Sequence, residues 1–380
     1  MKKQAGKHQS IPFTERSGKV RNLVDAFTTI YPRFTFGGAL GNILPVFHFH
    51  EVSAASLEAR LLYLAENGYR TVTSEAISCF VHRAVHPGRR AVALCFDDAW
   101  ASLWTVAAPL LRKYGFSAIT FAIPGRITGE NILRPTIEDG MVQPEMPDRS
   151  EQPFVTWLEL RALHASGVID VQCHTLSHSQ VFCSSQTIGF VTPEYEKSSL
   201  LSRPLVSQGE DLSFLKPSDL GAPLYPQRSR MSDGLRFFED VDVRNRCQAY
   251  VAAAGGKDFF IRPAWRKELG SLLKISAGVY ESSARRDEAI LEELVLGRRL
   301  LNERLNTDSV RHICFPWMTA GEAARQALKR AGFETAFSNR VFGLRAVKAG
   351  DHPYQLMRLS NDFIFCLPGS GRRFFRWRKQ

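Results

Sequence analysis

Residues 91–123, with the sequence AVALCFDDAWASLWTVAAPLLRKYGFSAITFAI, decide the fold. Residues 91–96 form an apolar run of strand length, residues 107–114 have the apolar spacing of a helix that Gly115 ends, and residues 117–123 form a second apolar run. A strand, a helix and a second strand in this order make a βαβ unit, whose strands are parallel and covered on both faces. The stretch therefore predicts an α/β fold built on a parallel sheet.

The same alternation continues on both sides of this unit. Further strands are expected at 43–49, 169–173, 310–315 and 335–338, and further helices at 56–67, 156–166, 287–305 and 320–331. Residues 189–280 interrupt the pattern, because they hold six prolines and show little periodicity. We expect this segment to be an insertion.

The composition is that of a folded globular protein, since 44% of the 380 residues are apolar and 23% are charged. No window approaches 18 consecutive apolar residues, and no apolar segment follows the basic start of the chain. We therefore expect no spanning helix, no signal peptide and a cytoplasmic location. The seven cysteines include no CxxC pair, which fits reduced thiols and indicates no cysteine-based metal site.

The net charge of +11 is concentrated near the two ends. Residues 1–21 and residues 370–380 each carry +5, which leaves only +1 for the rest of the chain. A nucleic-acid-binding fold carries its basic surface on the folded part, so we expect no nucleic-acid partner. Cations alternate with aromatic residues in 370–380, a pattern that favours peripheral contact with an anionic membrane at its inner face. The alternative is a solvated basic end that aids solubility.

Polar side chains follow two of the expected strands. Asp97 and Asp98 come directly after residues 91–96, and His174 and His178 follow residues 169–173. The carboxyl ends of parallel strands meet at one edge, and an i, i+4 spacing places two imidazoles on one side of a helical turn. Together with one carboxylate, the two imidazoles make a facial metal site that leaves positions open for water and substrate. Each pattern alone has a commoner explanation, such as turn capping, but their joint occurrence indicates a metal site.

Four segments together resemble the polysaccharide deacetylases, the NodB-homology or carbohydrate esterase family 4 group. The segment 93–99, ALCFDDA, is similar to the first motif of that family, and 174–178, HTLSH, fits its second motif, H-[ST]-x-x-H. The segment 315–318, FPWM, resembles the third motif, and 46–50, VFHFH, resembles the entry strand. The resemblance covers about residues 43–188 and 285–365.

The resemblance implies a distorted (β/α) barrel with a large insertion between the second and third motifs. The expected organisation begins with a basic N-terminal extension (1–42) and a first part of the barrel (43–188). An inserted subdomain (189–284), a second part of the barrel (285–368) and a basic aromatic tail (369–380) follow. Aromatic and arginine residues in the insertion suit either a sugar-binding wall or the core of a packed helical subdomain; they are Tyr225, Arg228, Arg230, Phe237, Phe238, Phe259, Phe260 and Trp265.

The family's site roles carry over onto the matching positions. Asp98, His174 and His178 resemble the metal ligands, and imidazole and carboxylate ligands point most simply to Zn²⁺. By the same resemblance Asp97 is the general base, and the main-chain N–H of Trp317 stabilises the oxyanion.

Several family features have weaker matches in this chain. Ala99 replaces the usual glycine, and the arginine that holds the base has only two candidates, Arg311 nearby and Arg358 further on. His352 is the one histidine after the third motif and is the candidate general acid. The predicted substrate-binding residues are His48, His50 and Pro316.

The leading functional expectation is a metal-dependent hydrolase that removes acetyl groups from an N-acetylated carbohydrate, a precursor in bacterial envelope polysaccharide or glycolipid synthesis. Two alternatives stay open. One is a metal hydrolase of the same fold that acts on a non-sugar amide. The other is a non-catalytic carbohydrate-binding relative.

Overall fold

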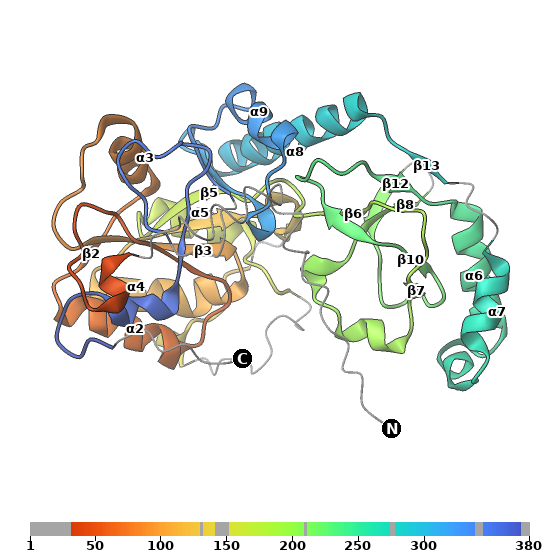
Figure 1. Ribbon diagram of the computed structural model, residues 1–380. Coiled ribbons are helices and arrows are strands. Elements are labelled where there is room, and N and C mark those ends of the chain that lie inside the picture. The colour runs from red at the N-terminus through yellow and green to blue at the C-terminus, as the bar shows by residue number, and fades with distance from the viewer. Residues whose placement is uncertain are drawn as a thin grey trace. The chain divides into compact units, whose positions relative to one another are not determined.

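The computed structural model describes residues 32–129, 132–140, 152–208, 211–273, 278–338 and 345–373 (Figure 1). The chain forms two compact units. Unit 1 consists of Met1–Ser177, Glu293–Ala320 and Arg325–Gln380, and unit 2 of His178–Glu292 and Gly321–Ala324. The predicted extension 1–42 lies mostly outside the described residues, and so does the end of the predicted tail, from residue 374 on.

An all-parallel sheet forms the centre of unit 1. Its strand order is β15-β14-β5-β4-β3-β1-β16, and β2 pairs with β3 outside this path. The strands are β1 (Val46–Phe49), β2 (Arg70–Thr71), β3 (Ala91–Asp98), β4 (Ala118–Ala122), β5 (Ile169–Cys173), β14 (His312–Cys314), β15 (Thr335–Phe337) and β16 (Leu359–Ser360). The βαβ unit predicted from residues 91–123 is confirmed, with β3 longer by the two aspartates.

The chain segment before β16 closes this sheet into a barrel. Leu356 forms a parallel bridge with Phe337 of β15, and β16 then pairs with β1. Hydrogen bonds continue along the seam, from Ala336 N to Pro353 O at 2.8 Å and from Ser338 N to Leu356 O at 3.2 Å. The predicted fold class, a distorted (β/α) barrel, is therefore confirmed, and its closure depends on residues 353–360.

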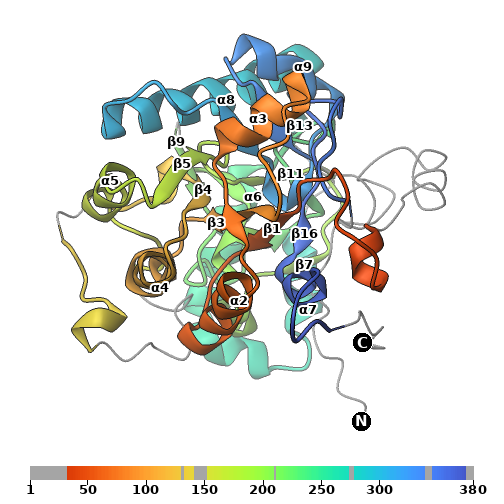
Figure 2. The ribbon, with the colours of Figure 1, turned by 90° about the vertical axis from the view of Figure 1, so that its left-hand side faces the viewer.

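Helices connect the strands of unit 1, and Figure 2 shows α2, α4 and α5 around the outside of the strands. α5 begins at Thr156, whose hydroxyl accepts from Glu159 N while the Glu159 carboxylate accepts from Thr156 N, a reciprocal capping box. Gly115 ends α4 with a φ of 68°, a left-handed conformation that favours glycine. The helices are α2 (Ala54–Glu66), α3 (Ser74–Arg83), α4 (Ala108–Tyr114), α5 (Trp157–Ala165), α8 (Ser283–Leu305) and α9 (Glu322–Arg330).

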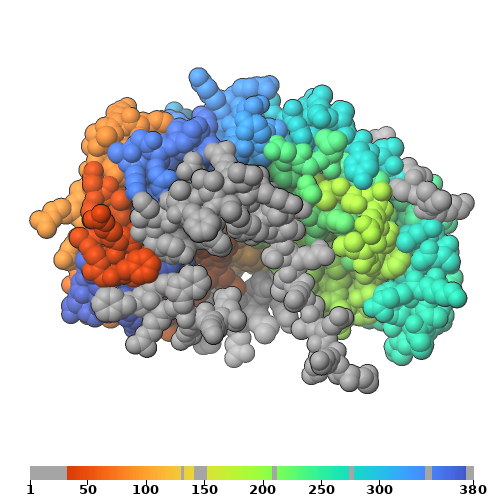
Figure 3. Space-filling model, viewed as in Figure 1, coloured from red at the N-terminus to blue at the C-terminus, as the bar shows by residue number. Residues whose placement is uncertain are grey.

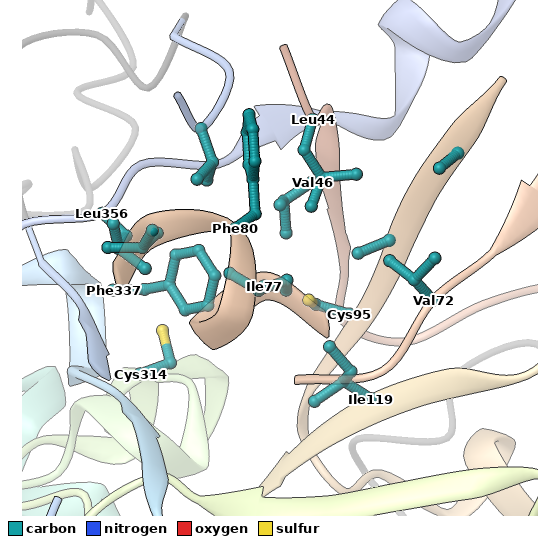
Figure 4. Packing of buried hydrophobic residues seen from close by; sticks show 14 of the residues in the cluster. Leu44, Val46, Val72, Ile77, Phe80, Cys95, Ile119, Cys314, Phe337 and Leu356 are labelled. Carbon is teal, nitrogen blue, oxygen red and sulfur yellow. The ribbon is translucent and has the colours of Figure 1, made fainter. Parts of the chain in front are cut away.

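A continuous apolar cluster fills the barrel, and Figure 4 shows ten of its residues by name. Leu44 and Val46 enter it from the first strand segment, and Ala91, Ala93 and Cys95 from β3, so alternate residues of each strand face the interior. Ile77, Phe80 and Val81 of α3 pack against the same cluster. α3 was not predicted from the sequence, because two positions of its buried face are the polar residues Ser74 and Ser78.

The first and last described segments of unit 1 lie against each other, where Figure 3 shows red and dark blue atoms side by side. The Arg372 guanidinium donates to the carbonyl oxygens of Phe34, Gly37 and Gly38, each at 2.7 Å, and to that of Cys366 at 2.9 Å. Arg372, which belongs to the predicted basic tail at 369–380, is therefore a structural residue of unit 1. The Arg372 guanidinium joins the first described segment of unit 1 to the last one.

Unit 2 combines antiparallel strand pairs with α6 (Val241–Ala253), α7 (Trp265–Leu272) and the first part of α8. The pairs are β6 with β11, β7 with β10, β8 with β9 and β12 with β13; their bounds are Gln180–Phe182, Gly189–Phe190, Leu205–Gln208, Asp211–Phe214, Pro223–Leu224, Gln227–Ser229, Phe237–Phe238 and Val279–Tyr280 for β6 to β13. The predicted insertion, 189–284, lies within this unit.

Most of the aromatic side chains considered for a sugar-binding wall are core residues of unit 2. Tyr225 and Phe237 belong to one buried cluster, and Phe259 and Trp265 belong to a second. Arg230 is also buried and forms a two-bond ion pair with Glu281. These side chains therefore hold the unit together.

Among the described residues, no helix combines the length and the apolar composition that crossing a bilayer requires.

Candidate functional site

Charged and imidazole side chains replace apolar ones at the carboxyl ends of the barrel strands. On the inner side of the first strand Val46 is followed by His48 and His50, and on β3 Cys95 is followed by Asp97. In the closing segment Leu356 is followed by Arg358. Because β1 pairs with β3 on one side and with β16 on the other, these polar groups gather at one end of the barrel.

Asp98, His174 and His178 come together at this end. Asp98 pairs in register with Ala122 of β4, and His174 N donates to Ala122 O at 2.8 Å, so both residues flank the end of the same strand. All three side chains are buried, and one possible ligand atom of each lies within 4.8 Å of the other two. Two imidazoles and a carboxylate at such separations match the donor set of a catalytic Zn²⁺ site with an open position.

The ring of His174 is oriented for ligation. Its Nδ1 lies 2.5 Å from Cys314 O, and since a carbonyl only accepts, Nδ1 carries a proton and Nε2 is the ring atom left to face a cation. Nε2 points to Asp98 Oδ1 at 3.3 Å. Burial lowers the pKa of His174, but the side chains of Asp98 and Cys314 outweigh burial and raise the pKa well above its ordinary value. The surroundings of this ring therefore favour positive charge, as a bound cation requires.

Two close approaches fix the loop that carries both histidines. Gly125 N donates to Leu176 O at 2.8 Å, and the Glu293 carboxylate accepts from the main-chain N and the hydroxyl of Ser177 at 3.0 and 2.6 Å. A Cβ on Gly297 of α8 would lie 2.9 Å from Leu176 N. Glycine at 297 therefore lets α8 pack directly against this loop.

Asp97 forms a buried ion pair with Arg358. The guanidinium donates to Oδ1 at 2.6 Å and to Oδ2 at 2.7 Å, and the two side chains are 3% and 4% exposed. Burial raises the pKa of Asp97, but the Arg358 guanidinium outweighs burial and holds the pKa well below its usual range. Asp97 is therefore ionised at neutral pH, held in one orientation, and adjacent in sequence to Asp98.

The two histidines of the first strand differ in their surroundings. The His50 side chain is 55% exposed, and its Nε2 lies 3.7 Å from Asp97 Oδ2. His48 is more deeply buried, and its Nδ1 has no hydrogen-bond partner. Burial, with help from Arg358, lowers the pKa of His48 to about 4. His48 is therefore neutral at physiological pH, and His50 is the imidazole that reaches both solvent and Asp97.

The turn after β14 contributes its main chain. Trp317 and Met318 both have positive φ, 51° and 57°, and Pro316 is buried at the start of the turn. Cys314 O before this turn binds His174, and the Met318 sulfur lies 3.4 Å from an Arg358 nitrogen. The main chain of Trp317 is thus held between a ligand residue and the partner of Asp97.

Backbone strain is concentrated in the turns that carry these residues. Six of the nine non-glycine residues with positive φ in the described ranges lie there, namely Asp98, Ala99, Thr175, His178, Trp317 and Met318. Left-handed conformations of such residues cost of order 1–3 kcal/mol each and persist where the surroundings impose them, often at functional sites. Ala99, at φ 56°, shows why a glycine is easier at that position.

Two candidates from the sequence lie elsewhere. Arg311 pairs with Glu334 at 3.0 Å and Glu75 at 3.3 Å, and it precedes β14 at the amino ends of the strands. His352 is exposed in a turn before the closing segment, at the level of Ala336 rather than Arg358. Of the two arginine candidates, Arg358 holds Asp97, and the structure does not bring His352 to the site.

A second group of metal-ligand type lies at the amino ends of the strands. Possible ligand atoms of Glu75, His312 and Glu334 lie within 4.8 Å of one another. The Arg311 guanidinium already pairs with both carboxylates, and His312 Nδ1 lies 2.8 Å from the Thr335 hydroxyl. These residues therefore neutralise one another as an ion-pair network.

Comparison with known proteins agrees with this arrangement. Residues 84–201, which include Asp97, Asp98, His174 and His178, match the family model described as polysaccharide deacetylase. This segment of the chain is similar in sequence to the polysaccharide deacetylases. The solved BpsB deacetylase domain from Bordetella bronchiseptica is similar to the chain in fold, with a TM-score of 0.51 at 14% identity, over 85% of this chain and 97% of that chain.

Two curated proteins are similar to part of the chain in sequence. One is YxkH of Bacillus subtilis (strain 168), whose name assigns it to the polysaccharide deacetylases; it is 31% identical over 88 residues, 21% of this chain and 32% of its own length. The other is the poly-β-1,6-N-acetyl-D-glucosamine N-deacetylase of Escherichia coli (strain K12), 27% identical over 148 residues, 39% of this chain and 21% of its own length. The matched segments thus span less than a third of each relative.

Two residues of the site had only a weak signal, or none, in the sequence. Arg358 follows Leu356 on the inner side of the closing segment, a signal that appears only once that segment is known to be extended. Trp100, which donates to Asp98, had no signal beyond its position two residues later.

Proposed function

We propose that the chain is a metal-dependent hydrolase that removes the acetyl group from an N-acetylated carbohydrate. The observation that carries this proposal is the combination of Asp98, His174 and His178 with the adjacent ion pair of Asp97 and Arg358. A ligand group alone would suit a structural metal. A buried, ionised carboxylate beside it, turned by an arginine, supplies the base that hydrolysis needs.

The residues have distinct roles in this reaction. A divalent cation held by the three ligands, most simply Zn²⁺, would polarise the acetyl carbonyl and lower the pKa of a water molecule. Asp97 accepts the proton of the attacking water, and the Trp317 N–H donates to the carbonyl oxygen as it becomes negative. When the C–N bond breaks, acetate leaves and the amine nitrogen takes a proton. His50, exposed and 3.7 Å from Asp97, replaces His352 as our proposed donor of that proton.

The carbohydrate class rests on the relatives, because the name of the Escherichia coli protein specifies deacetylation of a polymer of N-acetyl-D-glucosamine. We propose an N-acetylated sugar precursor of bacterial envelope polysaccharide or glycolipid as the substrate. We propose that His48 and His50 contact this sugar, and the support is that His50 is exposed and lies 3.7 Å from Asp97. Pro316 is buried, so we propose that it acts through the turn it begins.

The test is metal content together with acetate release from chitooligosaccharides and acetylated nucleotide sugars. Asp97→Asn should keep the metal and lower turnover by about 10²–10⁴-fold, because the amide cannot accept the proton. Asp98→Asn and His178→Ala should lower bound metal well below one per chain. Asp287→Asn, which changes a carboxylate that is 54% exposed, is the control and should change neither.

Other outcomes would favour the alternatives. Bound metal with acetate release only from non-sugar amides would indicate a hydrolase of another substrate class. Sugar binding without metal or turnover would indicate a carbohydrate-binding protein. Normal turnover by Asp97→Asn would remove Asp97 as the base.

We also propose that the chain acts in the cytoplasm and contacts the inner face of the membrane peripherally. The support is the sequence Phe374-Phe375-Arg376-Trp377-Arg378-Lys379, where aromatic residues suit the interface and cations suit anionic headgroups. Since Arg372 joins the ends of unit 1, the truncation that tests this should end at Arg373. Co-sedimentation with anionic vesicles at low salt should be lost on truncation, and equal binding by both chains would contradict the proposal.

A further inference from the structure

The two oxygens of the Asp98 carboxylate have different neighbours. Oδ2 accepts a hydrogen bond from the indole Nε1 of Trp100 at 2.9 Å. Oδ1 lies 3.3 Å from His174 Nε2, on the side of the other ligand atoms. The Trp100 side chain is only 7% exposed, and a buried indole N–H needs an acceptor. The carboxylate therefore has one oxygen directed to the indole and the other toward the ligand group.

Trp100 itself is held in a rigid frame. It forms an antiparallel bridge with Phe154, and its ring lies 4.8 Å from the Phe154 ring at an angle of 31°. Hydrogen bonds from Ala101 N to Pro153 O at 2.8 Å and from Val155 N to Ala99 O at 2.9 Å lie on either side of this bridge. The next residue, Thr156, caps α5. The position of the indole is thus determined by β3 and by the segment that begins α5.

We propose that Trp100 is a positioning residue that makes Asp98 a ligand through one oxygen, Oδ1. The inference rests on the proposed function, in which Asp98, His174 and His178 hold a divalent cation. The indole N–H keeps Oδ2 turned away, as Cys314 O keeps Nδ1 of His174 turned away. A carboxylate that binds through one oxygen leaves a coordination position open, which hydrolysis requires. Partners of this kind typically change metal affinity by about 10–100-fold when they are removed.

The chain offers a matched control. Trp104 is partly buried, and its Nε1 donates to Arg134 O at 2.7 Å. Trp100→Phe and Trp104→Phe therefore each remove one indole hydrogen bond and keep an aromatic ring, but only the first removes a bond to Asp98. Both should be prepared in the full chain.

The readout is the dissociation constant for Zn²⁺, measured by competition with a chromophoric chelator, and the visible spectrum of the Co²⁺ form. Trp100→Phe should weaken Zn²⁺ binding by about 10–100-fold and alter the Co²⁺ spectrum. Trp104→Phe should match the unchanged chain in both measurements. Equal affinity and equal spectra for Trp100→Phe and the unchanged chain would overturn the inference while leaving the metal site intact. Failure of the unchanged chain to bind metal would instead overturn the proposed function, and this inference with it.

A measurement on the unchanged chain covers the case in which Trp100→Phe does not fold. Zn²⁺ addition should shift the indole ¹H–¹⁵N resonance of Trp100 and leave that of Trp104 in place, with Trp104→Phe used for assignment. The other four indole resonances are assigned in the same way with single Trp→Phe variants, which leaves that of Trp100 identified. A Trp100 resonance that does not respond to Zn²⁺ would overturn the inference.

Discussion

Replacement of Arg358 by methionine tests the central ion pair of the site. Methionine fills a similar length with apolar atoms but cannot donate to Asp97, whose two oxygens now accept at 2.6 and 2.7 Å. The carboxylate would stay buried, with 3% of its side chain exposed, and would lose its cation. We therefore expect Arg358→Met to destabilise the fold as well as the site.

The magnitude follows from the burial of both partners. Removal of one partner from a buried ion pair costs about 3–5 kcal/mol, because the remaining charge is uncompensated. That loss is a large part of the ~5–15 kcal/mol by which a domain is stable. Asp97→Asn combined with Arg358→Met removes both charges, so the double variant should be more stable than Arg358→Met alone by about 2 kcal/mol or more.

The assay is urea unfolding of the four chains in the presence of a chelator, so that metal binding does not contribute. In the unchanged chain the lowered pKa of Asp97 gives stability that is present above the ordinary aspartate pKa of about 3.9 and is lost as pH falls below it. Without Arg358, burial raises the pKa of Asp97, so the stability gap between the two chains should narrow as pH falls from 7 to 4. A fall in unfolding free energy below about 1 kcal/mol for Arg358→Met would refute the reasoning. So would a fall for the double variant equal to the sum of the falls for the two single variants.

Three further predictions concern the surroundings of the site. The pKa of His48 in the folded chain is about 4, below the ordinary 6.5, so the unfolded chain takes up a proton first and the unfolding free energy falls as pH drops from 6.5 to about 4. His48→Gln should remove this part of the fall, at most on the order of 3 kcal/mol in urea unfolding. Parallel plots of unfolding free energy against pH for the two chains would contradict the prediction. Gly297→Ala should weaken Zn²⁺ binding about tenfold in a chelator competition, since its Cβ would lie 2.9 Å from Leu176 N and move the histidine loop. Arg372→Ala should lower the unfolding free energy by about 2 kcal/mol or more, because four carbonyl oxygens lose a charged donor; an unchanged midpoint would mean that the ends of unit 1 are joined by other contacts.

Local sequence was sufficient for the elements on which the site is built. The apolar run at 91–96 and the helix that Gly115 ends predicted β3, α4 and β4, because strand and helix periods and a left-handed glycine are properties of neighbouring residues. The polar residues after two such strands predicted where Asp97, Asp98, His174 and His178 lie, because parallel strands carry their sites at the carboxyl ends. α3 was missed, since Ser74 and Ser78 share the buried face with Ile77, Phe80 and Val81 and weaken its apolar pattern.

Only the tertiary structure decided which distant groups complete the site. Arg358 reaches Asp97 across a separation of 261 residues, and this contact exists because residues 353–360 close the barrel between β15 and β1. The same closure leaves His352 in an exposed turn, whereas His50 reaches Asp97 because β1 pairs with β3. The neighbours of a side chain across a sheet depend on strand order and register, which are set by the packing of the whole barrel. The sequence around any one residue therefore contains no pattern that predicts them.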